Sequence, residues 1–233
     1  MDSNTRKQDV LRLIIETFVH TNQPVGSMQV AEQLPYEVSS ATIRNDMVEM
    51  TALGLLAQPH TSAGRVPTEL GYQHYVKVLV QRQKELSKKQ QEVLSRHLKS
   101  IRDLQERYRA AAKMLAEATG NVSFLMDADK VYFSGLSQMA QLPEFEDQSF
   151  RTRMMEAVER PQEFVKSLGD LSEQDDAQVL IGSGQNMQNA TVVISQFGPQ
   201  GHKRVISIIG PTRMRYDKTL PLVNYMKKLL EEL

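Results

Sequence analysis

The sequence predicts an α+β protein with a winged helix-turn-helix at the N-terminus, a long connecting helix and an α+β domain at the C-terminus. Three observations predict this arrangement. Apolar residues return at helical spacing within residues 5–53, before a short strand and a turn that contains Gly and Pro. The following stretch, to residue 118, is almost free of Gly and Pro, and the rest alternates β-rich runs with amphipathic stretches. We therefore expect three regions, residues 1–70, 71–118 and 119–233.

Three helices are expected in the first region. The first covers residues 5–21, whose apolar residues share one helical face: Val10, Leu11, Ile14, Ile15 and Phe18. The second covers residues 27–34, with Ser27 as an N-cap whose hydroxyl accepts a backbone N–H bond. The third covers residues 39–53, because a serine can cap its start and Gly54 is a typical C-terminal stop.

The third helix carries the pattern of a DNA-reading helix. Ile43, Met47 and Met50 share one face and are expected to pack on the first two helices. The opposite face carries Ala41, Arg44, Asn45 and Val48. Arg and Asn make paired hydrogen bonds to guanine and adenine in the major groove, and the N-terminal hydroxyls of Ser39 and Ser40 suit phosphates. A helix presented by its N-terminal end is the docking geometry of a helix-turn-helix.

A strand over residues 55–60 and a turn over residues 61–67 form the expected wing. We expect Gly64 to permit a tight turn and Arg65 to stand at the wing tip, beside a phosphate or in the minor groove. The pattern alone leaves an alternative open. The three helices could be a packing module, with Arg44 paired to Asp46 or Glu49 rather than to a base.

The expected connecting helix has an apolar seam at heptad spacing: Ile101, Leu104, Tyr108, Ala111, Leu115 and Ala118. The spacing favours self-association with a second chain over packing on the C-terminal domain. Residues 68–115 carry eleven Lys or Arg against five Asp or Glu. This basic face is either solvated or adds non-specific attraction to the flanking DNA.

The C-terminal region is expected to consist of short strands flanked by helices. Amphipathic helices are expected over residues 150–168 and 217–233. The expected strands are Val122–Met126, Val131–Phe133, Val179–Ile181, Thr191–Ser195 and Val205–Ile209.

Composition excludes several classes of protein. The 233 residues include no cysteine, and the five histidines show no metal-ligand spacing, so neither a metal nor a cofactor is expected. No apolar run approaches the length of a membrane span and no catalytic constellation is evident, so we expect a cytoplasmic protein that is not an enzyme. The net charge is zero, yet residues 1–67 carry five Lys or Arg against seven Asp or Glu. DNA binding therefore has to rest on a few well-placed residues.

Several stretches resemble the heat-inducible transcription repressor family HrcA. In the first region these are PVGS at 24–27, VSSATIRNDM at 38–47, LGLL at 53–56 and QPHTSAGRVPT at 58–68. Later motifs are GLS at 135–137, PEF at 143–145 and IGPTRMRY at 209–216.

The resemblance implies a homodimeric repressor of chaperone operons that binds an inverted-repeat operator in double-stranded DNA and leaves it under heat stress. It also implies control by the GroE chaperonin. A two-fold dimer matches a palindromic operator by symmetry. The predicted DNA-binding residues are Ser27, Ser39, Ser40, Ala41, Thr42, Arg44, Asn45, His60, Thr61, Ser62 and Arg65.

One departure from the family pattern concerns the C-terminal domain. Members of the family have a longer chain with a GAF-like central domain, whereas about ten residues separate the strand at 122–124 from Gly135 here. We therefore expect a reduced GAF-like α+β domain for regulation and dimerisation. A winged-helix regulator that responds to a small ligand in this domain remains the alternative.

Overall fold

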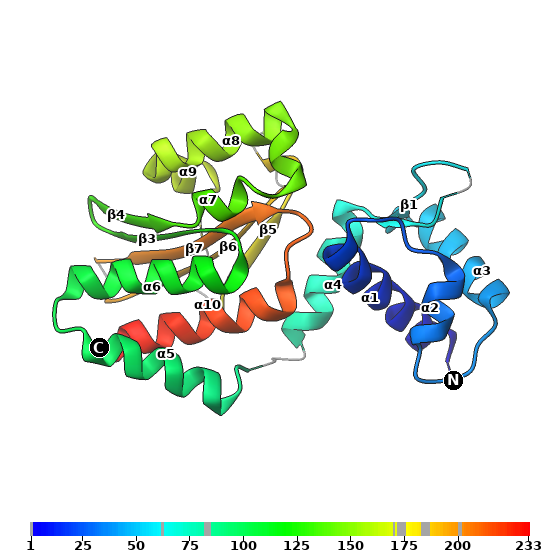
Figure 1. The fold of residues 1–233 in the computed structure, drawn as a ribbon, viewed down its shortest axis with the longest axis horizontal. Coiled ribbons are helices and arrows are strands. Elements are labelled where there is room, and N and C mark those ends of the chain that lie inside the picture. Colours follow the sequence, from blue (N-terminus) through cyan, green and yellow to red (C-terminus); the bar gives the residue numbers. More distant parts are fainter. Residues whose placement is uncertain are drawn as a thin grey trace. The chain divides into compact units, whose positions relative to one another are not determined.

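The structure is a computed structural model of the chain. It describes residues 2–61, 63–81, 85–169, 171, 176–182, 187–199 and 202–233. The chain divides into an N-terminal unit, Met1–Arg82, and a C-terminal unit, Gln83–Leu233 (Figure 1).

The N-terminal unit is a winged helix-turn-helix with one additional helix. Its elements are α1 (Ser3–Thr21), α2 (Ser27–Gln33), α3 (Ser40–Ala52), the antiparallel strands β1 (Leu56–Ala57) and β2 (Val66–Pro67), and α4 (Glu69–Gln81). The predicted apolar faces of α1 and α3 meet in the core, where Val10, Ile14 and Ile43 are fully buried. Burial of these aliphatic side chains is the main force that holds the helices together.

The unit extends past residue 70 because α4 packs on α1. Tyr72, Tyr75 and Val76 of α4 are buried, and the Tyr75 hydroxyl donates a hydrogen bond to the Glu16 carboxylate of α1 at 3.3 Å. The start of the expected connecting helix is therefore part of the core of the N-terminal unit.

The single connecting helix that we predicted is wrong. The stretch forms three helices, α4, α5 (Lys88–Ser100) and α6 (Leu104–Thr119). Two polar N-caps determine where α5 and α6 begin. The Ser87 hydroxyl accepts from the backbone N–H of Gln90 in a capping box, and the Asp103 carboxylate accepts from the backbone N–H of Glu106 at 2.8 Å. A stretch that lacks Gly and Pro can therefore still form several separate helices, because polar N-caps begin new ones.

The apolar seam of α6 packs on the protein's own sheet. Tyr108, Ala111 and Leu115 are buried within one chain, and α6 lies against β3, β4 and the C-terminal helix. The preference for self-association through this seam is therefore wrong, because the side chains are already covered. Leu104, at the first turn of α6, stays exposed.

A five-stranded antiparallel sheet forms the centre of the C-terminal unit. Its strands are β3 (Val122–Asp127), β4 (Lys130–Ser134), β5 (Gln178–Ile181), β6 (Ala190–Phe197) and β7 (Arg204–Pro211), in the order β4-β3-β7-β6-β5. All five expected strands are thereby confirmed. In the pairing register Val122 opposes Ile209, and Ile194 opposes Ser207.

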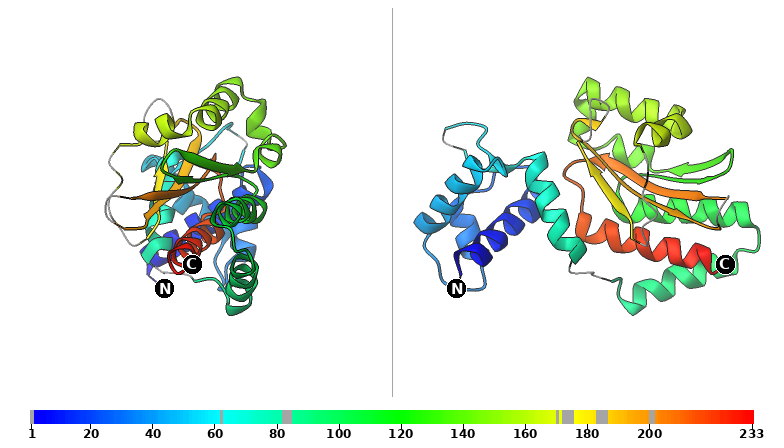
Figure 2. Two further views of the ribbon diagram at one scale, coloured as in Figure 1. Left: turned by 90° about the vertical axis from the view of Figure 1, so that its left-hand side faces the viewer. Right: turned by 180° about the vertical axis from the view of Figure 1, so that it is seen from behind.

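Helices cover both faces of this sheet (Figure 1; Figure 2). One face packs on α6 and α10 (Tyr216–Glu231). The other lies under α7 (Leu136–Met139), the 3-10 helix η1 (Pro143–Glu146), α8 (Gln148–Glu159) and α9 (Pro161–Ser167). The expected helix 150–168 is split between α8 and α9 because Pro161 cannot donate a backbone hydrogen bond. The predicted fold class, a winged helix-turn-helix joined to an α+β domain, is confirmed.

Candidate nucleic-acid interface

Ser39 determines where α3 begins. Its side-chain oxygen accepts a hydrogen bond from the backbone N–H of Thr42 at 3.1 Å, so the predicted serine cap is confirmed. The two hydroxyls of Ser39 and Thr42 also lie 2.8 Å apart. Ser39 is exposed, and Ser40, the first helical residue, is half-buried. This end of α3 therefore presents unpaired backbone N–H groups and a hydroxyl, which suit a phosphate.

The two faces of α3 differ as the sequence predicts. Ile43, Met47 and Met50 are at most 3% exposed. The opposite face is exposed and consists of Ala41, Arg44, Asn45 and Val48. In the part of the chain that the structure describes, Arg44 and Asn45 make no hydrogen bond or ion pair within the protein. Their donors and acceptors are therefore available to a ligand.

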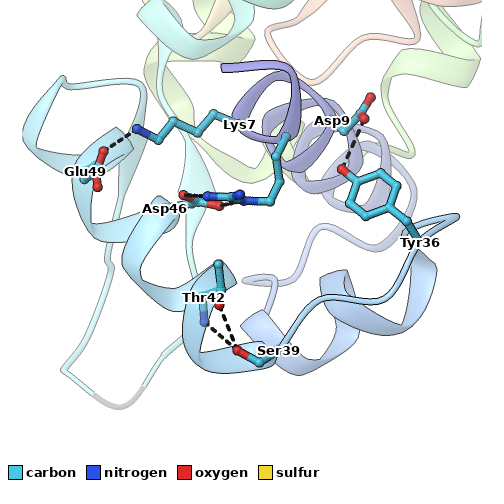
Figure 3. Close-up of polar contacts among 8 residues, drawn as sticks. Lys7, Asp9, Tyr36, Ser39, Thr42, Asp46 and Glu49 are labelled. Carbon is cyan, nitrogen blue, oxygen red and sulfur yellow. Dashed lines mark hydrogen bonds and ion pairs between the residues drawn. The ribbon is translucent and has the colours of Figure 1, made fainter. Parts of the chain in front are cut away.

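The acidic neighbours of Arg44 are bound to α1. Asp46 is 3% exposed, and its carboxylate accepts from Nε and Nη2 of Arg6 at 2.7 and 3.1 Å. Glu49 pairs with Lys7. The Asp46 carboxylate raises the pKa of Arg6 by hydrogen bonding and by its charge. Figure 3 shows Asp46, Glu49 and Lys7 at this junction between α1 and α3. The alternative in which Arg44 pairs with Asp46 or Glu49 is not observed.

A second polar contact fixes the segment that leads into α3. The Tyr36 hydroxyl donates to the Asp9 carboxylate of α1 at 3.2 Å (Figure 3). Burial, together with the negative charge of Asp9, raises the pKa of Tyr36. The hydroxyl therefore stays protonated and keeps its donor at physiological pH.

The wing is a short antiparallel hairpin whose loop is organised by Gln58. The Gln58 side-chain amide donates to the backbone oxygens of Thr61 and Ala63 at 2.9 and 3.2 Å. His60 and Thr61 are exposed on this loop, as a DNA contact requires. Ser62, the other predicted contact of the loop, lies outside the described residues.

Arg65 lies at the base of the wing and not at its tip, where we predicted it. Its backbone N–H and C=O both bond to Val25, each at 2.9 Å, in an isolated antiparallel bridge. Its side chain is half-buried, and Nε donates to the Thr51 hydroxyl of α3 at 3.1 Å. Arg65 therefore joins the wing to α3 and to the turn before α2. The prediction failed because nothing in the local sequence shows that Arg65 pairs with Val25, 40 positions earlier, in a bridge outside the strands.

Gly64 serves a purpose other than the predicted tight turn. A Cβ atom at this position would lie 2.3 Å from the backbone oxygen of Val25, closer than any real contact. Only a glycine allows the two backbones to approach in this way.

Ser27 is not the N-cap of α2 and is not exposed. The cap position is Gly26, and Ser27 is the first helical residue, 9% exposed. Its buried side chain is thus a poor candidate for a DNA contact. The helix starts one residue earlier than a serine cap requires, since the backbone N–H of Val30 donates to the backbone oxygen of Gly26 at 3.2 Å.

Sequence reasoning missed the polar network that holds α3 on α1. Arg6 and Asp46 are 40 positions apart, so no local spacing relates them. It also missed Gln58, although a glutamine at the start of a turn is a signal that could have been used.

Neither a metal site nor a membrane span is found among the described residues. They contain no group of three or more His, Cys, Asp or Glu side chains that could hold a metal ion. None of the helices they form is long and apolar enough to cross a membrane.

Comparison with known proteins identifies the family. The family model of the HrcA protein C-terminal domain matches residues 61–220, and the model of the winged helix-turn-helix transcription repressor, HrcA DNA-binding, matches residues 3–82. The heat-inducible transcription repressor HrcA of Thermobifida fusca (strain YX) is 47% identical over 120 residues, 52% of this chain and 35% of that protein. That of Desulfitobacterium hafniense (strain DSM 10664 / DCB-2) is 36% identical over 143 residues, 61% of this chain and 41% of that protein.

This chain therefore spans well under half the length of these two curated relatives. Among solved structures, a hypothetical protein is similar with a TM-score of 0.83 at 20% identity, over 97% of both chains, which supports the fold alone. Since the two family models together match residues 3–220, the chain belongs to the HrcA family of winged helix-turn-helix transcription repressors, which are not enzymes.

Proposed function

We propose that this chain is a heat-responsive transcription repressor that binds an inverted-repeat operator upstream of chaperone operons as a homodimer. The observation that carries the proposal is the exposed face of α3, where Arg44 and Asn45 are unpaired within the described residues while the nearby acidic groups are bound to α1. An Arg and an Asn held in this way can each form two hydrogen bonds with one base in the major groove.

The neighbouring groups support the same docking. Val48 is 52% exposed beside these two side chains, and an aliphatic group there suits the methyl group of thymine. Ser39 and the start of α3 suit a phosphate, and His60 and Thr61 of the wing suit the backbone of the adjacent groove. The revised set of proposed DNA contacts is Ser39, Ser40, Ala41, Thr42, Arg44, Asn45, Val48, His60 and Thr61.

The response to heat is taken from the relatives, which are named heat-inducible transcription repressors. Release from the operator under heat stress, control by the GroE chaperonin, and a cytoplasmic location belong to the same proposal. A homodimer is proposed because an inverted repeat has two equivalent half-sites.

The alternative of a ligand-responsive regulator has no comparable support among the described residues. The sheet face under α7, α8 and α9 is filled by large apolar side chains, including Phe124, Met139, Phe150 and Met154. Such packing stabilises the domain. We therefore propose that the signal is heat and not a ligand.

The test is selection of bound sequences by the full chain from a pool of random DNA duplexes. We expect enrichment of an inverted repeat whose half-sites are separated by about one helical turn or a multiple of it. Enrichment of no sequence, or of a single unrepeated site, would contradict the proposal. A small molecule that releases the enriched duplex at constant temperature would instead support the ligand-responsive alternative.

A further inference from the structure

Four cations of α5 form a stripe on the surface of the C-terminal unit. We name Lys88, Lys89, Arg96 and Lys99 the α5 stripe; all four are exposed. At 100° per residue they fall within an arc of about 100° on the helix, away from the buried Leu98. Glu92 is the one acidic residue of α5. Within the described residues, none of the four cations forms an ion pair or hydrogen bond.

The stability of α5 does not account for this arrangement. Lys88 and Lys89 occupy the first helical turn, where the partial positive charge of the helix end disfavours cations. Glu92 stands four residues after Lys88 and four before Arg96, a spacing suited to ion pairs, yet it pairs with neither. The packing of α5 depends on other residues, since Leu98 is buried and the backbone oxygen of Gln91 accepts from the Tyr225 hydroxyl of α10 at 2.9 Å.

The N-terminal unit, in contrast, has few cations to offer to phosphates. Arg6 and Lys7 are bound to Asp46 and Glu49. Arg12 lies within ion-pair distance of two acids of its own helix, and Arg65 is half-buried against Thr51. DNA-binding proteins obtain much of their affinity by neutralising phosphates and releasing counterions. Among the described residues of this unit, Arg44, which faces the bases, and Lys77 of α4 are the exposed cations, so further charge for phosphates has to come from another element.

We propose that the α5 stripe binds phosphates of the DNA duplex that flanks the half-site read by α3. Six residues separate the end of α4 from the start of α5, so a docked winged helix raises the effective concentration of the stripe near the same duplex. The inference rests on the proposed function for how the duplex is brought to the stripe. A lipid surface is a poorer partner, because the apolar side of α5 packs against its own unit and is not free to enter a bilayer.

The test compares two triple variants of the full chain that lose the same charge. The test variant is Lys88→Gln/Lys89→Gln/Arg96→Gln, and the control is Lys130→Gln/Arg160→Gln/Lys166→Gln, which removes three exposed cations from other elements of the same unit. Affinity is measured against salt concentration on three duplexes. The first ends at the selected operator, the second carries about ten further base pairs on each side, and the third is a random sequence of the second length. Circular dichroism verifies that both variants are folded.

We expect the test variant to bind both long duplexes with a shallower dependence of log affinity on log salt. Each lost phosphate contact lowers the slope by about 0.9, so the change approaches about 2.7 per chain. The short duplex and the control variant should show wild-type slopes. A test variant with the wild-type slope on both long duplexes would overturn the proposal. So would loss of binding to phosphatidylserine vesicles with DNA binding unchanged.

Failure of the proposed function has a different signature. A wild-type chain that binds the selected and random long duplexes equally has no operator. The random duplex still reports on the α5 stripe in that case, because phosphate contacts do not depend on sequence.

Discussion

Arg44 is available to DNA because its acidic neighbours are bound elsewhere. On a helix, residues two positions apart lie on different sides, so the buried Asp46 faces α1 while Arg44 faces solvent. The same carboxylate thus holds α3 in place without competing for the residue that reads the bases. Sequence spacing alone does not show whether Asp46 pairs with Arg44 or with a residue of another helix.

Arg44→Ala should abolish preference for the operator without unfolding the protein. The loss of a paired contact to one base costs about 1–3 kcal/mol per half-site. Affinity for operator and for random duplex is the measurement, with the melting temperature as a check and Arg160→Ala, another exposed arginine, as the control. Operator affinity equal to wild type would remove Arg44 from the reading face.

Arg6→Ala should lower the melting temperature, because it leaves the buried Asp46 carboxylate without its partner. Adding Asp46→Asn should recover part of the loss, since the amide keeps the shape and removes the unpaired charge. Thermal unfolding of the two variants and the wild type provides the comparison. An Arg6→Ala variant as stable as wild type would show that the ion pair does not hold α3 on α1.

Among the elements, the wing depends on close backbone contact with the turn before α2. Gly64→Ala should destabilise the N-terminal unit by about 1–3 kcal/mol, because the new methyl group would force apart the Val25–Arg65 bridge. Gly26→Ala is the matched control one residue from Val25, where an added Cβ meets nothing within 4 Å. Chemical denaturation of both variants measures the difference. Equal losses at the two positions would contradict the requirement for glycine at 64.

Local patterns predicted most of the elements and the two faces of α3. Ile43, Met47 and Met50 repeat at helical spacing, and Ser39 is a typical cap, so both signals lie within one helix. The place of Arg65 could not be predicted in this way, because it depends on a backbone bridge to Val25, 40 positions away. The seam of α6 was detected, but spacing cannot say whether a sheet of the same chain or a second chain covers it.

In the whole molecule, the N-terminal unit should fold as an independent domain when it includes α4. A fragment of residues 1–82 should unfold cooperatively, whereas residues 1–68 should be much less stable because Tyr72, Tyr75 and Val76 would be missing from the core. Thermal melts followed by circular dichroism compare the two. Sedimentation should show a monomer for the longer fragment, and a stable dimer would contradict the assignment of dimerisation to the C-terminal unit.

Heat release should depend on protein concentration. If warming separates the proposed homodimer, a single half-site contributes too little affinity, and higher protomer concentration shifts release to a higher temperature. Operator binding and dimer fraction are followed against temperature at two protein concentrations, with and without chaperonin. Release from an intact, folded dimer would contradict this mechanism. Release only when chaperonin is withdrawn would show that the chaperonin controls this chain.

The position of β7 at the centre of the sheet also determines the order in which a nascent chain can fold. β7 pairs with both β3 and β6, so before residues 204–211 have been synthesised the β3–β4 hairpin and the β5–β6 pair have no strand to connect them. The N-terminal unit is complete at residue 82 and can fold on the ribosome while the rest is being made. The helix α3 can thus fold early, and the C-terminal unit completes its sheet only after β7 has been made.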